Sequence, residues 1–231
     1  MSDSKTLMKE MLASAVHFGH KTSKWNPKMA PYIYTQKNGV HVFDLNQTVD
    51  GLNQATEFLR GASAQGKTIL FVSTKRQATQ TIKEAAERCH MPYVTSKWIP
   101  GLLTNFKTIR ARMNFLEKLK HEKETGEFDK YTKKEASDFD KQIEKLEMAL
   151  GGVLSLERVP DVVFIVDVCR DRIAVQEANK MGITVVAVVD SNANPDGIDF
   201  VIPGNDDANK AIKFFVEQAE TAIKAGKSQK A

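Results

Sequence analysis

The sequence predicts an α/β protein: a mostly parallel sheet with helices on both faces and an inserted, protruding antiparallel coiled-coil hairpin. Short β-rich apolar runs alternate with segments of helical periodicity along most of the 231 residues, as in chains of βαβ units. Several of these runs are continuous, which is typical of strands buried on both faces. Residues 104–150 instead carry many charges and apolar residues at heptad spacing, which predicts the hairpin.

The N-terminal part predicts a short helix, an irregular basic stretch and a β-hairpin. Apolar side chains gather on one side of a helix over residues 7–15. Residues 32–35 and 40–44 are β-rich, and the dipeptide Asn38-Gly39 between them tolerates the positive φ angles of a tight turn.

The next segments begin the alternation of helix and strand. Apolar residues recur at helical spacing over residues 49–62, and the apolar run 68–72 predicts a buried strand. Thr74 and Gln77 have the spacing of a capping box, so we expect a helix to begin there. Residues 93–94 predict a short strand.

The charged insert predicts two helices that pack against each other. Each has one narrow apolar seam, formed by Phe106, Ile109, Met113 and Leu116 in the first helix and by Phe139, Ile143, Leu146 and Leu150 in the second. Gly126 lies in the connection, and Thr132 with Glu135 has the pattern of a capping box. Seams that bury each other predict an antiparallel hairpin that projects from the main body.

The last third of the chain returns to the βα alternation. The expected elements are strands over 162–166, 184–189 and 200–202, a helix over 172–181 that Gly182 ends, and a final helix over 208–225. Residues 1–103 and 151–226 are therefore expected to form one α/β domain, with 104–150 inserted as the hairpin. The polar residues 227–231 are expected to be a disordered tail.

Composition restricts the class of protein. No apolar run approaches the roughly 20 residues of a membrane span, and the N-terminus lacks a secretory signal, so we expect a cytoplasmic protein. Cys89 and Cys169 lie far apart and favour free thiols in a reducing compartment. The net charge of +4 is uneven, because residues 155–207 hold ten acidic and four basic residues and the rest is basic. We therefore expect a polyanion to bind the segments outside residues 155–207.

One segment suggests an enzyme. Residues 61–68 match the phosphate-binding pattern GxxxxGK(S/T). A phosphate-binding loop runs from a strand into a helix, whose free N–H groups face the phosphates. Here a helix precedes the motif and a strand follows it, which favours an ordinary helix-to-strand turn.

Acidic residues suggest a second alternative. They follow the predicted parallel strands, where open α/β sheets bind ligands, and they are Asp167, Asp171, Asp190, Asp196 and Asp199. A Mg²⁺ or phosphotransfer centre is conceivable there, but no nucleophile and base accompany them, and Asp is common in turns. His17 and His20 lack a second ligand pair at zinc-finger spacing. We therefore expect no catalytic residue, no metal site and no cofactor.

Basic and aromatic residues favour nucleic-acid binding instead. Lysines interleave with Trp25 in the first basic stretch, a mixture that suits phosphates and exposed bases. Lys75 and Arg76 occupy the first turn of a predicted helix, where the helix dipole disfavours cations, so an anionic partner is expected there. The candidate RNA contacts are Lys21, Lys24, Trp25, Lys28, Lys75, Arg76, Lys97, Trp98, Lys107 and Arg110.

Five segments together resemble the small-subunit ribosomal protein S2 family of bacteria and organelles. They are VHFGHKTSKWNPKM, YIYTQKNGVHVFDLNQTV, WIPGLLTNFKTI, PDVVFIVD and NPDGIDFVIPGNDDA, in an order and spacing that cover residues 7–225. The resemblance implies a flavodoxin-like domain with a protruding coiled coil, no catalysis, and a place on the small subunit in contact with its rRNA. It also implies neighbouring ribosomal proteins, including the large mRNA-binding protein of repeated OB domains, and neither a membrane nor a small-molecule substrate.

The chain departs from the family pattern near Trp98. The family usually has Arg before this Trp, whereas Lys97 stands here and cannot form a bidentate fork. A structural RNA-binding protein is the favoured interpretation. A phosphate-handling α/β enzyme and a protein scaffold without RNA are the alternatives.

Overall fold

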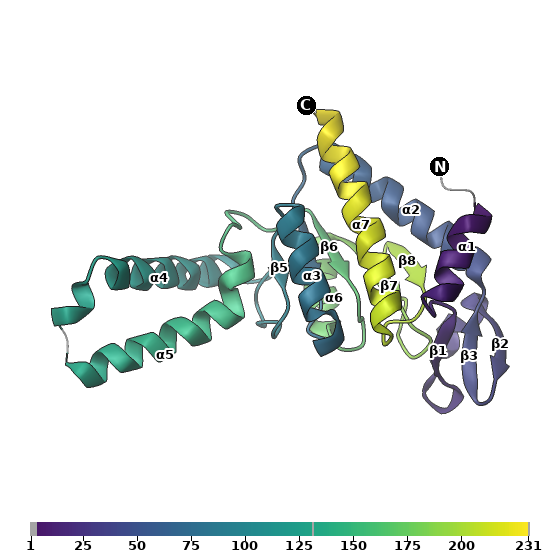
Figure 1. The fold of residues 1–231 in the computed structure, drawn as a ribbon, viewed down its shortest axis with the longest axis horizontal. Coiled ribbons are helices and arrows are strands. Elements are labelled where there is room, and N and C mark those ends of the chain that lie inside the picture. The colour runs from purple at the N-terminus through teal and green to yellow at the C-terminus, as the bar shows by residue number, and fades with distance from the viewer. Residues whose placement is uncertain (1–3, 131, 231) are drawn as a thin grey trace.

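The computed structural model describes residues 4–130 and 132–230, and its centre is a five-stranded parallel sheet in the order β5-β4-β6-β7-β8 (Figure 1). The strands are β4 (Ile69–Val72), β5 (Tyr93–Val94), β6 (Val162–Ile165), β7 (Thr184–Val189) and β8 (Phe200–Pro203). Every neighbouring pair is parallel. Numbered within this sheet, the order is 2-1-3-4-5, one of the two common doubly wound arrangements.

The strand residues divide between two cores, one on each face of the sheet. In β4, Ile69 and Phe71 belong to the core on one face, and Leu70 and Val72 to the core on the other. This alternation follows from the two-residue period of a strand, and it explains why the apolar run is continuous.

Helices cover both faces. The helices packed on the first face are α1 (Ser4–Ala13), α2 (Leu45–Ala64), α3 (Arg76–Arg88) and α7 (Asn209–Lys230). On the second face lie α6 (Arg172–Met181) and the segments that lead into and out of the insert. Gly182 ends α6 in the left-handed region, at φ +66°, as expected from the sequence. In the described part of the chain, no helix combines the length and apolar character that a bilayer crossing needs.

The C-terminal helix continues further than expected. α7 runs to Lys230, and the ammonium of Lys227 donates a hydrogen bond to the carbonyl of Cys89 over 2.5 Å. Residues 227–230 are therefore helical rather than a disordered tail, whereas Ala231 lies outside the described residues.

The predicted N-terminal hairpin is present and belongs to a small antiparallel sheet in the order β1-β3-β2. Its strands are β1 (Phe18–Lys21), β2 (Ile33–Lys37) and β3 (Val40–Phe43). Asn38 and Gly39 form the turn, with φ of 51° and 75°. Each outer strand has one register shift against β3, between Phe18 and Lys21 in β1 and between Ile33 and Thr35 in β2.

The insert contains two helices, α4 (Phe106–Glu124) and α5 (Lys133–Leu150), which extend away from the β5 edge of the sheet in Figure 1. Several residues of the predicted seams are buried, namely Ile109, Met113, Leu116, Ile143 and Leu150. Lys120 pairs with Glu147, and Lys123 with Asp140, across the two helices. The capping box of Thr132 and Glu135 is formed.

Candidate nucleic-acid interface

The strand order reverses between β4 and β6, and this is where doubly wound sheets usually bind ligands. In this protein, side chains of the protein itself occupy this position, among them Thr74, Asp171 and Lys75. The carboxylate of Asp171 accepts hydrogen bonds from the backbone N–H and the hydroxyl of Thr74, at 3.0 and 2.9 Å. The predicted capping box of Thr74 and Gln77 is therefore wrong, because the buried carboxylate takes the Thr74 hydroxyl and Lys75 becomes the residue that precedes α3.

Lys75 is buried in an acidic cluster, which we define as Asp167, Asp190, Asp206 and Asp207. Its ammonium lies 2.7 Å from Asp206, 2.6 Å from Asp207 and 3.3 Å from Asp167. This corrects the expectation that Lys75 faces RNA. An anionic partner does offset the unfavourable helix dipole, but it consists of carboxylates of the same chain.

The acidic cluster shifts the pKa values of its members. Burial would lower the pKa of Lys75, but the carboxylates outweigh it and raise that pKa. Burial and the charges of Asp167 and Asp190 raise the pKa of Asp206 to about 7. A hydrogen bond to Asp190 raises the pKa of His20. Burial is thus the largest cause for Asp206, whereas nearby carboxylates raise the pKa values of Lys75 and His20.

Three members of this region have the spacing of a cation site. His20, Asp190 and Asp206 each offer a ligand atom, and these atoms lie within 4.8 Å of one another. An imidazole and two carboxylates are ligands that a divalent ion could use.

The aspartates that follow the predicted strands do not all lie in one place in the structure. Asp167 and Asp190 lie in the acidic cluster, but Asp196 pairs with Lys28, and Asp199 accepts the backbone N–H of Val185 at 2.8 Å. Sequence reasoning missed Asp206 and Asp207. They follow β8, so the rule that polar residues after parallel strands share one edge would have found them.

The first basic segment is exposed beside this edge. Lys21, Lys24 and Lys28 are exposed. The ring of Trp25 is 39% exposed and lies 5.1 Å from the ring of the buried His41. The backbone N–H of Asn26 donates to the carbonyl of Ser191 over 2.7 Å, which fixes this segment against the end of β7. Flat and charged groups thus lie together on a surface, as the sequence predicts.

The remaining candidates separate into exposed and structural residues. Arg76, Lys97 and Lys107 are exposed. Trp98 is only 5% exposed, and Arg110 donates from one guanidinium nitrogen to the carbonyls of Leu154 and Leu156, at 2.9 and 3.1 Å. This corrects the expectation for Trp98, which is too buried to stack on a base. Arg110 is partly exposed and also ties α4 to the segment after α5.

Glu177 holds the segment that leads into α4. Sequence reasoning missed it, because an acidic residue in a predicted helix is not a distinctive signal. Its carboxylate accepts hydrogen bonds from the indole of Trp98, from the backbone N–H groups of Gly101, Leu103 and Thr104, and from the hydroxyl of Thr104. Burial would raise the pKa of Glu177, but these hydrogen bonds outweigh it and lower that pKa.

The motif at residues 61–68 has the reversed order that the sequence predicts. α2 ends at Ala64, Gly66 turns the chain at φ +73°, and β4 begins at Ile69. No helix N-terminus follows the lysine within this described segment, so the amide cradle of a phosphate-binding loop is missing.

Comparison with known proteins decides the family. A profile described as "Ribosomal protein S2" matches residues 11–226. The chain belongs to the ribosomal protein S2 family. The match spans the parallel sheet and the α4–α5 insert, so the resemblance drawn from five sequence segments is confirmed.

Named relatives from three bacteria match this chain over almost its full length and over almost their own. The chain is 50% identical over 223 residues to "Small ribosomal subunit protein uS2" of Mannheimia succiniciproducens, which covers 96% of this chain and 92% of the relative. It is also 47% identical over 222 residues to the protein of that name from Shewanella amazonensis, which covers 96% of this chain and 92% of the relative. The protein of that name from Psychromonas ingrahamii is likewise 47% identical over 222 residues, which covers 96% of this chain and 91% of the relative.

Proposed function

We propose that this protein is a structural component of the small subunit of the bacterial-type cytoplasmic ribosome, without catalytic activity, and that it binds rRNA. The observation that carries the proposal is the S2-family match over residues 11–226, together with relatives that are named as small-subunit proteins and match nearly end to end. The family implies a structural role. The filled switch point agrees with it, because this is the position where an α/β enzyme would bind its substrate.

Exposed basic and aromatic side chains are the proposed rRNA contacts. They are the candidates that the fold leaves at least partly exposed, namely Lys21, Lys24, Trp25, Lys28, Arg76, Lys97, Lys107 and Arg110. We expect contacts with phosphate and with RNA shape, because base edges in duplex RNA are poorly accessible to side chains. Such binding weakens steeply as salt concentration rises.

The insert is the second proposed contact element. We propose that residues 104–150 form a coiled-coil hairpin, set into one α/β domain made of residues 1–103 and 151–226. The buried seam residues and the two ion pairs between α4 and α5 support this proposal. The hairpin and the acidic face would meet neighbouring ribosomal proteins, among which we include the mRNA-binding protein with repeated OB domains.

Sedimentation of cell lysate through a sucrose gradient tests the proposal. An epitope-tagged copy of this chain should travel with the small subunit and with whole ribosomes. Treatment of the lysate with ribonuclease should release it to the top of the gradient. A chain that stays at the top of the untreated gradient, while a second small-subunit protein sediments normally, would exclude ribosomal association.

A further inference from the structure

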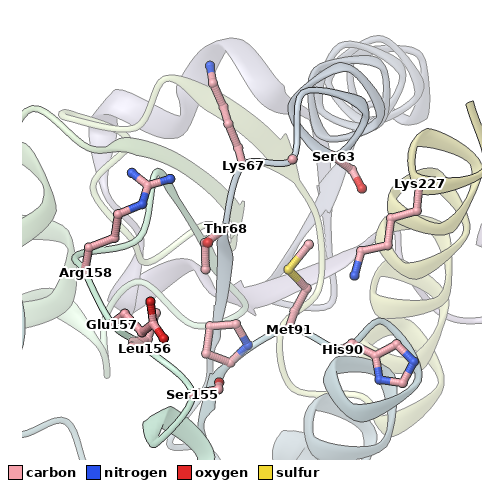
Figure 2. Close-up of a pocket in the computed structure, with 12 residues that line it drawn as sticks. Ser63, Lys67, Thr68, His90, Met91, Ser155, Leu156, Glu157, Arg158 and Lys227 are labelled. Atoms are coloured by element: carbon pink, nitrogen blue, oxygen red, sulfur yellow. The ribbon is translucent and has the colours of Figure 1, made fainter. Parts of the chain in front are cut away.

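Two cavities lie at opposite edges of the parallel sheet, and they differ in whether their positive side chains already have partners. The cavity drawn in Figure 2, of about 760 Å³, lies at the edge where the strands begin. Its Arg158 pairs with Asp161 at 3.0 Å, and its Lys227 donates to a backbone carbonyl. Lys67 extends away from the other lining residues in Figure 2. The cations of this cavity are therefore either paired or directed elsewhere.

The second cavity, of about 520 Å³, lies at the opposite edge, beyond the carboxyl ends of β6 and β7. We call it the α6 cavity, because it is lined by side chains between residues 168 and 179, together with Asn26 and side chains between residues 192 and 196. Its volume is within the roughly 300 to 1,000 Å³ of pockets that bind small molecules. Among the described residues, no member of the acidic cluster and none of the proposed rRNA contacts lines it.

Two arginines line the α6 cavity without a carboxylate partner. Within the described chain, the guanidinium of Arg172 makes no hydrogen bond and no ion pair. Arg170 donates from Nε to the hydroxyl of Thr74 over 3.1 Å, which leaves its other two guanidinium nitrogens available. Asp196, the acidic residue of the lining, is already paired with Lys28. The cavity therefore holds positive charge that nothing in its lining neutralises.

The start of α6 adds two backbone donors to these side chains. Arg172 and Ile173 are the first residues of the helix, and their N–H groups reach no acceptor in the described part of the chain. The side chain of Asp171 does not cap the helix, because its carboxylate accepts hydrogen bonds from Thr74 instead. The helix dipole disfavours a cation in the first turn, and a bound anion would offset this cost. These groups together indicate a carboxylate or a phosphate as the occupant.

Asn192 favours a carboxylate that belongs to a peptide. Its side chain lines the α6 cavity, and its Oδ1 is buried without a hydrogen bond from any described residue. Such an acceptor is costly to leave without a donor. Phosphate oxygens are acceptors and offer it nothing, whereas a peptide supplies both a carboxylate and N–H donors. Ile173, which is 44% exposed in the lining, offers an apolar contact for a neighbouring aliphatic side chain.

We propose that the α6 cavity binds an acidic peptide segment of another protein. The carboxylate of the segment lies at Arg172 and the start of α6, one of its backbone N–H groups donates to Asn192, and an aliphatic side chain covers Ile173. This surface is separate from the proposed rRNA contacts and from the α4–α5 insert. The proposal therefore does not depend on the proposed rRNA binding, and it can fail or hold independently of it.

Selection from a random nonapeptide library displayed on phage tests the proposal on the purified full-length chain. Wild-type protein should enrich peptides that carry Asp or Glu beside an aliphatic residue. In fluorescence anisotropy, an enriched peptide should bind Arg172→Ala about tenfold more weakly than wild type, the effect of losing one charge-assisted hydrogen bond. Asn192→Ala should weaken it roughly threefold, the effect of losing a neutral one. Lys180→Ala, an exposed cation of α6 outside the lining, is the matched control and should bind like wild type.

Three results would overturn the proposal. The first is a selection without enrichment of acidic peptides, and the second is equal affinity of the enriched peptides for wild type and Arg172→Ala. The third uses a single-stranded RNA 12-mer as a separate probe. If Arg172→Ala weakens binding of this RNA about tenfold and of no peptide, the cavity binds nucleic acid instead. Thermal unfolding of the three variants verifies that they fold.

Discussion

The indole nitrogen of Trp98 donates a hydrogen bond to the carboxylate of Glu177 over 3.1 Å, and both residues are buried. This bond joins the segment before α4 to helix α6 on the sheet. Four further hydrogen bonds from residues 101–104 end on the same carboxylate. The direction in which the insert leaves the sheet therefore depends strongly on one buried side chain.

Replacement of this carboxylate should destabilise the protein. In Glu177→Gln, the amide NH₂ group would face hydrogen-bond donors, and we expect a loss of about 2–4 kcal/mol in the free energy of unfolding. Urea unfolding measures this loss, and the fluorescence of Trp98 should shift to longer wavelength as its surroundings loosen. Gln176→Ala, at the exposed neighbouring position, is the control. Equal stability of the two variants would contradict the anchoring role.

The same substitution should change the dependence of stability on pH. The pKa of Glu177 is lowered in the folded protein, so its charged form contributes stability above its ordinary pKa near 4.5. That contribution is lost as pH falls through the folded pKa. The difference in unfolding free energy between wild type and Glu177→Gln should therefore narrow below about pH 4.5. A constant difference down to pH 3 would show that the hydrogen bonds do not favour the charged form.

Lys75 should matter for folding and not for RNA. Lys75→Ala leaves Asp206 and its neighbours without their cation, and loss of one partner of a buried pair costs about 3–5 kcal/mol. Arg76→Ala, at the exposed adjacent position, should change the unfolding free energy by less than about 0.5 kcal/mol. Urea unfolding of the two variants makes the comparison. If Lys75→Ala were as stable as Arg76→Ala, the ion pairs would be unimportant.

The contribution of Asp206 to the free energy of unfolding should fall as pH rises from about 4 to 7. The pKa of Asp206 is about 7 in the folded protein and ordinarily 3.8, so in this range the folded state keeps a proton that the unfolded chain releases. The raised pKa of His20 acts in the same direction above pH 6.5. One such proton contributes at most about 1.4 kcal/mol per pH unit.

Asp206→Asn should make this slope shallower, whatever its effect on absolute stability. The measurement is a series of urea unfolding curves at different pH values. Asp196→Asn serves as the control, because Asp196 is exposed and outside the acidic cluster. An unchanged slope in Asp206→Asn would assign the proton to another group.

Exposed lysines should contribute to RNA affinity through charge. Lys24→Ala and Lys107→Ala should each weaken binding to small-subunit rRNA, and each should lower the slope of log affinity against log salt concentration by about one. Filter binding at several salt concentrations measures the slope. Lys180→Ala, an exposed lysine of α6 outside the proposed contact set, should leave the slope unchanged. Equal slopes in all variants would remove Lys24 and Lys107 from that set.

Local sequence patterns predicted most helices and strands correctly. Where the structure differs from the prediction, the cause is a side-chain contact with a residue distant in the sequence. The strands β4, β6 and β7 follow from continuous apolar runs, and α6 ends at the glycine that the sequence indicates, because these signals lie within one element. The capping box of Thr74 failed because Asp171, almost a hundred residues away, takes its hydroxyl group. The environment of Lys75 likewise depends on Asp206 and Asp207 at the end of another strand, which no local pattern places beside it.

The bonds of Arg110 to the carbonyls of Leu154 and Leu156 have a consequence for variation in length. They connect the first turns of α4 to the segment that follows α5, so the two ends of the insert are joined where it meets the sheet. Removing seven residues from the distal part of each of α4 and α5 should preserve these hydrogen bonds and the sheet below them. We therefore expect that α4 and α5 can change in length while the parallel sheet stays intact, both in protein engineering and among related chains.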